Sequence, residues 1–177
     1  MKILRSLLVL TGLLSTVAAA ADTPFEAAYR TSLLKSFEES TGKLLSLAAA
    51  IPEANYGWRP MEGVSTVRDI LVHVTETHYA LAERLGTKPP PGIERKKMDA
   101  AMRTKAEAIA ATKRSVEFMA GVLAAIPADS LLPETKVFGA TVPTLRVTLL
   151  PVDHAHEHLG QLIAYARMNR VVPPWSK

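Results

Sequence analysis

The sequence predicts an all-α fold, a four-helix bundle in a single domain. Four long segments repeat apolar residues at the three- and four-residue spacing of a helix face. Proline- and glycine-rich stretches separate these segments, with neither an internal repeat nor an interdomain linker between them. Amphipathic helices of this length bury their apolar faces against one another, so four of them in a chain of 177 residues indicate a bundle.

The first helix is expected over residues 24–50, where Pro52 ends the helical pattern. Its apolar positions are Phe25, Tyr29, Leu33, Leu34, Phe37, Leu44, Leu45 and Leu47. Residues 52–63 follow as a loop rich in proline and glycine. We expect its two aromatic side chains, Tyr56 and Trp58, to pack on the bundle.

The second helix is expected to begin beside Thr66 and Asp69, which have the three-residue spacing of a capping box. It runs to about Leu85, where Gly86 and three successive prolines stop it. The third helix is predicted over residues 93–126, a stretch rich in the helix-forming residues Ala, Lys, Glu and Met.

Residues 128–143 connect the third helix to the fourth. Residues 137–142 could form a short extended segment, but no sheet is predicted there. Thr144 is expected to cap the fourth helix, which runs to about Asn169 with Pro151 as a kink near its start. The bundle domain is thereby assigned to residues 24–172.

Residues 1–20 are predicted to be a secretory signal peptide. Lys2 and Arg5 form a short basic region, residues 7–17 are mostly apolar, and the alanines that follow provide small residues for cleavage. The apolar stretch is about a dozen residues, short of the roughly 20 that span a bilayer, so an uncleaved anchor is the weaker alternative. We therefore expect a secreted protein of a bacterial periplasm, with no membrane association after cleavage.

Composition argues against several partner and cofactor classes. The formal net charge of +4 includes Lys2 and Arg5, so removal of the first 20 residues leaves only +2. Such a mildly basic chain gives no indication of nucleic-acid binding. The sequence contains no cysteine, which excludes a disulfide, a lipoprotein anchor and a c-type haem attachment motif.

The clearest functional signal is the run HAHEHLGQ, from His154 to Gln161, in the fourth predicted helix. At about 100° per residue, His154 and His158 share a narrow stripe with Gln161 and Tyr165, whereas His156 lies nearly opposite, beside the charged side chains. We expect the stripe to face the bundle interior. Two imidazoles one turn apart can bind one metal ion, and the alternative is a coincidence on the helix surface.

A third ligand has to come from another helix, and only His73 and His78 remain. The apolar arc of the second helix is centred about 100° from His73, which places this residue on the shoulder of the buried face. His78 lies about 140° round from His73 and cannot reach the same ion without a helix distortion. The consistent ligand set is therefore His73, His154 and His158, while His78 and His156 are interpreted as core or surface histidines.

Three neutral imidazoles from two helices would occupy one side of a divalent ion and leave positions open for water or substrate. Closed structural zinc sites use four protein ligands, so a three-histidine site is typical of catalysis. Such an ion can lower the pKa of a bound water, polarise a carbonyl or bind a thiolate. Ligation by nitrogen alone fits Zn, Ni, Fe and Mn about equally.

Four neighbours of the histidines are candidates for supporting roles. Gln161 and Tyr165 could line the site, although Tyr165 also fits a buried tyrosine with its hydroxyl satisfied. Asp69 and Glu76 lie one turn on either side of His73, where a carboxylate could orient the ring; the alternative is a solvated helix flank. Glu76 is the first candidate for a general base by its position.

These motifs resemble those of the DinB/YfiT-like superfamily of bacterial metal-dependent proteins. The resemblance covers nearly the whole chain after residue 20. It is strongest in the segment Ile70–His73 of the second helix and in His154–Gln161 of the last. The Trp58-Arg59-Pro60 loop and the pair Pro173-Pro174 match the family's habit as well.

The resemblance implies an up-down-down-up four-helix bundle with a three-histidine metal site, and carries the ligands onto His73, His154 and His158. It also implies a homodimer. The family's last-helix motif often reads His-Arg-Gly-Gln, whereas Leu159 stands here in place of the arginine, so any polar contact of that arginine is missing. Some relatives are transferases or isomerases that use cytosolic thiols, an activity that an exported chain puts in doubt.

The leading functional hypothesis is an exported metal-dependent hydrolase or transferase that acts on a small molecule. The alternative is a bundle that binds a metal or a small ligand without turnover. A third hypothesis, an adaptor with a vestigial site, requires the histidines to be replaceable.

Overall fold

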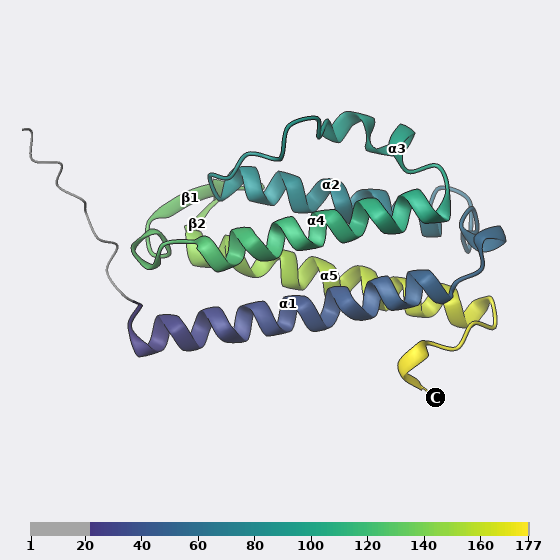
Figure 1. Ribbon diagram of the computed structural model, residues 1–177, viewed down its shortest axis with the longest axis horizontal. Coiled ribbons are helices and arrows are strands. Elements are labelled where there is room, and N and C mark those ends of the chain that lie inside the picture. The colour runs from purple at the N-terminus through teal and green to yellow at the C-terminus, as the bar shows by residue number, and fades with distance from the viewer. Residues whose placement is uncertain (1–21, 177) are drawn as a thin grey trace, which may run out of the picture.

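The computed structural model describes residues 22–176, and the predicted signal peptide, residues 1–20, lies outside this range. Four long helices form the body of the molecule (Figure 1): α1 (Pro24–Ala50), α2 (Val67–Arg84), α4 (Lys105–Ala125) and α5 (Thr144–Met168). Helix α1 packs against α4 and α5, and α2 packs against the same two. Within residues 22–176, no helix combines the length and the apolar character needed to cross a membrane.

The direction of each helix establishes the up-down-down-up order. Helices α1 and α5 run one way, and α2 and α4 run the opposite way (Figure 1). The crossover of residues 85–104 returns the chain along the bundle between α2 and α4. The predicted all-α four-helix bundle is therefore confirmed, and the predicted first helix has the bounds of α1.

Capping boxes begin three of the four long helices. The pairs are Thr23 with Glu26 in α1, Thr66 with Asp69 in α2, and Thr104 with Glu107 in α4. In each pair the threonine hydroxyl accepts from the third amide of the helix, and the acidic side chain accepts from the threonine amide. The capping box expected at Thr66 is confirmed, whereas the sequence prediction overlooked the one at Thr104.

The predicted third helix, residues 93–126, is wrong in its first part. The chain forms the one-turn helix α3 (Met98–Ala101), breaks, and only then enters α4. Met102 is fully buried at the break. The Arg68 guanidinium pairs with the Asp99 carboxylate at 2.7 Å and donates to the main-chain oxygens of Asp99 and Met102. Helix propensity favoured one continuous helix, but this long-range contact holds the break.

A two-stranded hairpin joins α4 to α5, so the expectation of no sheet here is wrong. Strand β1 (Glu134–Val137) pairs antiparallel with β2 (Ala140–Pro143), with Val137 opposite Ala140. The two turn residues, Phe138 and Gly139, have φ of 48° and 82°. A two-residue type I′ turn needs positive φ at both positions, and Gly139 meets this need without steric cost.

Helix α5 begins at Thr144, directly after Pro143. The prediction that Thr144 is the cap is wrong, because its hydroxyl donates to the main-chain oxygen of Pro133 at 2.9 Å across the base of the hairpin. Helix α5 continues through Pro151, which is buried within it. The ring nitrogen of Pro151 has no hydrogen to donate to the preceding turn, one turn before His154.

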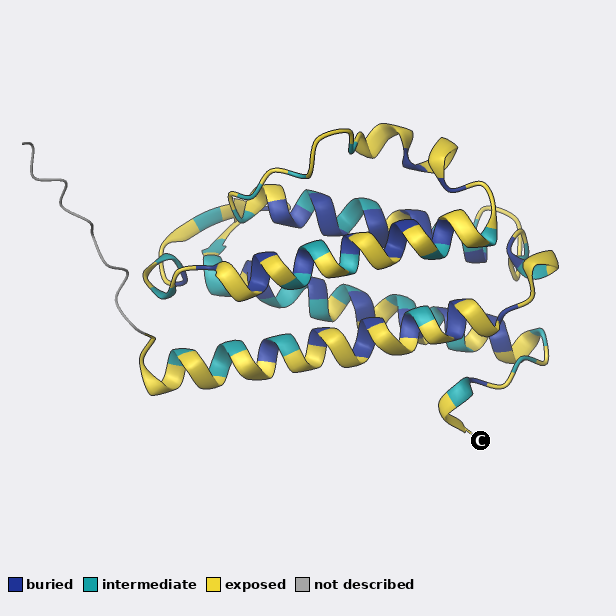
Figure 2. Ribbon diagram, viewed as in Figure 1, coloured by how far each residue is buried: buried dark blue, intermediate teal, exposed yellow. Residues whose placement is uncertain are grey.

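The core consists of two apolar clusters, one toward each end of the bundle, and buried residues line the inward sides of the helices (Figure 2). Buried polar residues fall between the two clusters along α1, α2 and α4. We call this set the middle layer: Ser40, Thr41, Thr75, His78, Thr112 and Ser115. The predicted packing of the loop aromatics is confirmed, since Tyr56 is buried and Trp58 packs against the first cluster.

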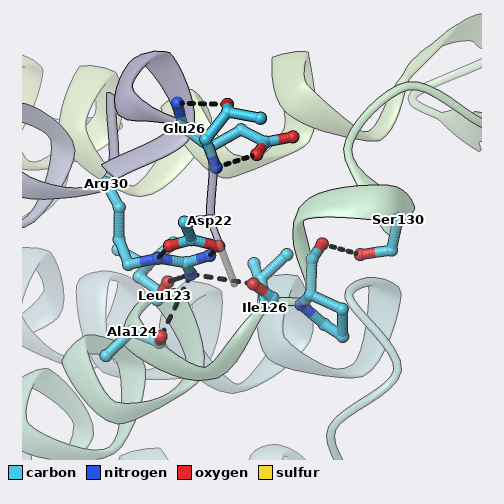
Figure 3. Close-up of polar contacts among 9 residues, drawn as sticks. Asp22, Glu26, Arg30, Leu123, Ala124, Ile126 and Ser130 are labelled. Carbon is cyan, nitrogen blue, oxygen red and sulfur yellow. Dashed lines mark hydrogen bonds and ion pairs between the residues drawn. The ribbon is translucent and has the colours of Figure 1, made fainter. Parts of the chain in front are cut away.

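The end of α4 is held by Arg30 of α1 (Figure 3). Its Nη1 donates to the main-chain oxygens of Leu123, Ala124 and Ile126 at 3.3, 3.0 and 2.8 Å. Its Nε lies 3.0 Å from a carboxylate oxygen of Asp22. The last carbonyl groups of a helix lack partners within the helix, and a cation is favourable there. Arg30 therefore joins α1 to the hairpin end of α4.

Candidate metal centre

Three histidines from two helices meet at the seam between α2 and α5. His73 lies on α2, and His154 and His158 lie one turn apart on α5. The Nε2 atom of His154 is 3.0 Å from Nε2 of His73 and 3.0 Å from Nε2 of His158. The structure thus brings together the three residues that helical geometry had selected, as a group that could hold a metal ion.

This histidine cluster lies at the margin of the core. His73 is exposed, and His154 and His158 are half-buried. The expectation that the stripe of α5 faces the interior is therefore only partly right. The apolar clusters fill the centre of the bundle, so side chains on the flanks of α2 and α5 meet where solvent reaches one side of the seam. A ligand could approach the cluster from that side.

The spacing of the three rings, and the lowered pKa of two of them, fit a divalent ion. Nitrogen atoms about 2 Å from one tetrahedral ion lie about 3.3 Å apart, and one ring nitrogen from each of the three histidines lies within 4.8 Å of the other two. Burial and the neighbouring imidazoles lower the pKa of His154 to about 3. Burial and His158 also lower the pKa of His73, against an opposing effect of Glu157. Both rings are therefore neutral at ordinary pH, the state that binds metals.

A hydrogen-bonded chain orients the His158 ring. Its Nδ1 lies 2.9 Å from Oε1 of Gln161, and Nε2 of Gln161 donates to the Tyr165 hydroxyl at 3.1 Å. The Tyr165 hydroxyl in turn donates to the main-chain oxygen of Ser65. An amide oxygen only accepts, so Nδ1 of His158 carries the proton and Nε2 presents its lone pair to the cluster. Gln161 therefore supports the site from behind, and Tyr165 is buried with its hydroxyl satisfied.

The two carboxylates considered as partners of His73 have other neighbours. Asp69 accepts from the Thr66 amide and pairs with Arg68. Within residues 22–176, no hydrogen bond or ion pair joins Glu76 to a histidine of the cluster. Burial raises the pKa of Glu76, with Arg95 opposing this effect and Asp99 adding to it.

Glu157 is an acidic neighbour of the cluster that was not among the predicted site residues. It is exposed on α5, directly before His158, and its charge partly opposes the lowering of the pKa of His73 on the facing helix. A carboxylate next to a histidine in the HAHEHLGQ run is the signal that could have identified it.

An open pocket of about 410 Å³ lies beside Glu76, one helical turn along α2 from His73. Glu94, Arg95 and Lys96 of the crossover segment line it together with Glu76. Its volume suits a small molecule. Charged side chains of both signs therefore border the pocket.

The other two histidines stay outside the cluster. His156 is exposed, as its angle on the helix predicted, and its Nδ1 donates to the main-chain oxygen of Val152 at 2.9 Å. His78 is fully buried in the middle layer, 3.0 Å from the Ser115 hydroxyl and edge-on to Phe37. Neither residue contributes a ligand atom to the group that could hold a metal.

Comparison with known proteins agrees with this architecture. The crystal structure of a DinB-like protein, YjoA, from Bacillus subtilis matches with a TM-score of 0.63 at 18% identity, covering 80% of this chain and 93% of that chain. At this identity the likeness supports the fold alone. No match was found among the curated proteins. The profile of the DinB superfamily matches residues 36–162, the greater part of the chain, and the protein therefore belongs to the DinB superfamily.

Proposed function

We propose that this protein is an exported metal-dependent enzyme, a hydrolase or transferase, that acts on a small molecule. One divalent ion would be held by His73, His154 and His158. The observation that carries the proposal is the approach of three Nε2 atoms from two helices, at 3.0 Å for two of the pairs. Three protein ligands leave coordination positions open, which is typical of catalytic sites.

The chemistry of the site follows from its donors and its exposure. A divalent ion held there would act as a Lewis acid toward water, a carbonyl or a thiolate. The ring of His158 is held for this task by Gln161. The exposed side of His73 admits a substrate, and the pocket bordered by Glu76, Arg95 and Lys96 offers space of a suitable size.

Glu76 remains the first candidate for a general base. It lies one turn from His73, and burial raises its pKa, which is the direction that favours a general base. Glu157 is the second candidate, because its charge acts on His73 from the facing helix. The two carboxylates can be separated by comparing Glu76→Gln with Glu157→Gln: loss of turnover with retained metal identifies the base.

A second candidate function is binding of a metal or small ligand without turnover. The observation that favours it is the lack, within the described residues, of any carboxylate hydrogen-bonded to a histidine of the cluster. Zinc-dependent enzymes commonly fix their histidine ligands through such bonds. Gln161 does this for His158, but without a negative charge.

The proposal includes export to a bacterial periplasm and assembly into a homodimer, with no nucleic-acid or membrane partner. Export is supported by the composition of residues 1–20. The N-terminal sequence of the protein recovered from its own cells tests it: a start near residue 21 supports export, and an intact N-terminus contradicts it.

The deciding experiment is elemental analysis of the protein purified from its own compartment. We expect about one divalent ion per chain, lost in His158→Ala. His156→Ala is the matched control, because it removes a histidine of the same motif that lies outside the cluster and should retain the ion. Turnover of an ester, amide or thiol substrate that also disappears in His158→Ala supports the enzyme. Metal binding without any turnover supports the second candidate, and a folded protein that binds no metal contradicts both.

A further inference from the structure

Two buried nitrogen atoms on facing helices lack a hydrogen-bond partner. Within residues 22–176 they are Nε2 of His78 and Nδ1 of His154, and no other buried side-chain nitrogen or oxygen is unpartnered. Buried polar groups are nearly always hydrogen-bonded, so both atoms require an explanation. Helices α2 and α5 pack together, so both unpartnered atoms are buried on helices that contact each other.

The contacts of His78 establish which of its nitrogens carries the proton. Its Nδ1 lies 3.0 Å from Oγ of Ser115, and that hydroxyl donates its only hydrogen to the main-chain oxygen of Thr112 at 2.8 Å. Oγ of Ser115 must therefore accept from Nδ1 of His78. Complete burial lowers the pKa of His78 to about 3, so the ring is neutral. Its unpartnered Nε2 is thus an acceptor.

The unpartnered atom of His154 is the complementary donor. Nε2 of His154 faces the other two histidines, and as a metal ligand it must present a lone pair. The proton of the neutral ring then lies on Nδ1, which becomes a buried N–H group without an acceptor. A buried donor and a buried acceptor on packed helices can satisfy each other through one water molecule, since such waters bridge polar atoms that lack direct partners.

We propose that His78 is a positioning residue for the metal ligand His154. One buried water accepts a hydrogen bond from Nδ1 of His154 and donates one to Nε2 of His78, and Ser115 anchors His78 to α4. This inference rests on the proposed role of His154 as a ligand. It extends the support of the site into the middle layer, where His78 orients His154 through the water as Gln161 orients His158 directly.

The test is the affinity of the purified protein for Zn²⁺ alone, measured by competition with a chelator. We expect His78→Phe to weaken binding about 10- to 100-fold, because outer partners of ligating histidines contribute on this scale. His78→Gln should retain most of the affinity, since its amide oxygen can accept from the water. Thr75→Val is the matched control: it removes a buried hydrogen bond of the same helix, to Thr112, and should leave Zn²⁺ affinity unchanged.

Unchanged Zn²⁺ affinity in a folded His78→Phe overturns the inference alone. Absence of Zn²⁺ binding by the unaltered protein overturns the proposed function as well, so the two failures are distinguishable. A second measurement does not depend on the folding of a variant: ring ¹⁵N NMR of the Zn²⁺-loaded protein. It should show His78 and His154 both protonated on Nδ1, and a proton on Nε2 of His78 overturns the inference.

Discussion

His158 donates a hydrogen bond from Nδ1 to Oε1 of Gln161, 2.9 Å away and three residues along the same helix. Residues three apart on a helix are neighbours on its surface, so the pairing is local to the HLGQ sequence. Its consequence is long-range: the proton is held on Nδ1, and Nε2 is turned toward His154 and His73. Tyr165 and the main chain of Ser65 hold Gln161 in turn.

Replacing Gln161 should therefore change metal affinity according to the new side chain's ability to accept a hydrogen bond from Nδ1 of His158. We expect Gln161→Leu to weaken Zn²⁺ binding by about tenfold or more, because Nδ1 of His158 loses its acceptor. Gln161→Glu should bind at least as tightly as the unaltered protein, since a carboxylate is a stronger acceptor. Chelator competition measures both. Equal affinities for the leucine variant and the unaltered protein would show that the hydrogen bond does not support the site.

Metal should stabilise the fold, because the three ligands belong to two different helices. A ligand at about 100 times its dissociation constant adds about 2.7 kcal/mol to the free energy of unfolding. We expect Zn²⁺ to raise the melting temperature of the unaltered protein and of His156→Ala, and a chelator to reverse the increase. His154→Ala should show no such increase. An equal increase in His154→Ala would place the bound ion elsewhere.

Removal of the Arg30 guanidinium should destabilise the bundle without affecting the histidine cluster. Arg30→Met leaves three main-chain oxygens at the end of α4 without their charged donor. The expected loss is about 1.5 to 3 kcal/mol in the free energy of unfolding, measured in urea. Asp22→Asn is the control, since it breaks only the ion pair and should cost less than about 1 kcal/mol. A loss in Arg30→Met no larger than in Asp22→Asn contradicts the capping role.

Acid should destabilise the protein through His78. Its pKa is about 3 in the folded state against an ordinary value of 6.5, because burial opposes the charged form. Between pH 6.5 and about 3, His78 is therefore protonated in the unfolded chain but neutral in the folded protein. This histidine therefore does not reduce the free energy of unfolding above pH 6.5. As the pH falls from 6.5 toward 3 it reduces that free energy, by up to about a factor of ten in the folding equilibrium per pH unit.

Urea unfolding of the metal-free protein between pH 7 and pH 4 checks this expectation. The His78→Phe variant should show a shallower decrease in the free energy of unfolding over the same range, because it has no ring to protonate. Parallel curves for the two proteins would show that another group causes the acid sensitivity.

The helices could be predicted where their signals are local. Residues 24–50 carry a complete apolar repeat that ends before a proline, and these are the bounds of α1. The break before α4 could not be predicted in this way, because burial of Met102 and the reach of Arg68 from α2 hold it. The hairpin was overlooked because its turn depends on positive φ at Phe138, a residue that rarely adopts it.

The histidine cluster likewise has features that local sequence predicts and features that depend on tertiary packing. Spacing along α5 placed His154 and His158 on one face and turned His156 away, since a helix converts spacing directly into direction. The choice of His73 over His78 also followed from helical angles. Only the packing of α2 on α5 brought the Nε2 atoms to 3.0 Å, left His73 exposed and placed Glu157 within electrostatic range of it.

The proposed role of His78 could be inferred only from the tertiary structure. In the sequence it is one histidine on an apolar helix, and nothing near it along the chain identifies a partner. The bundle places it against Ser115, 37 residues away, and packs its own helix, α2, against the helix of His154. Local sequence therefore determines which residues share a helix face, because that depends on a few neighbouring dihedral angles. Which faces meet, and how deeply a ring is buried between them, depends on how all four helices pack at once.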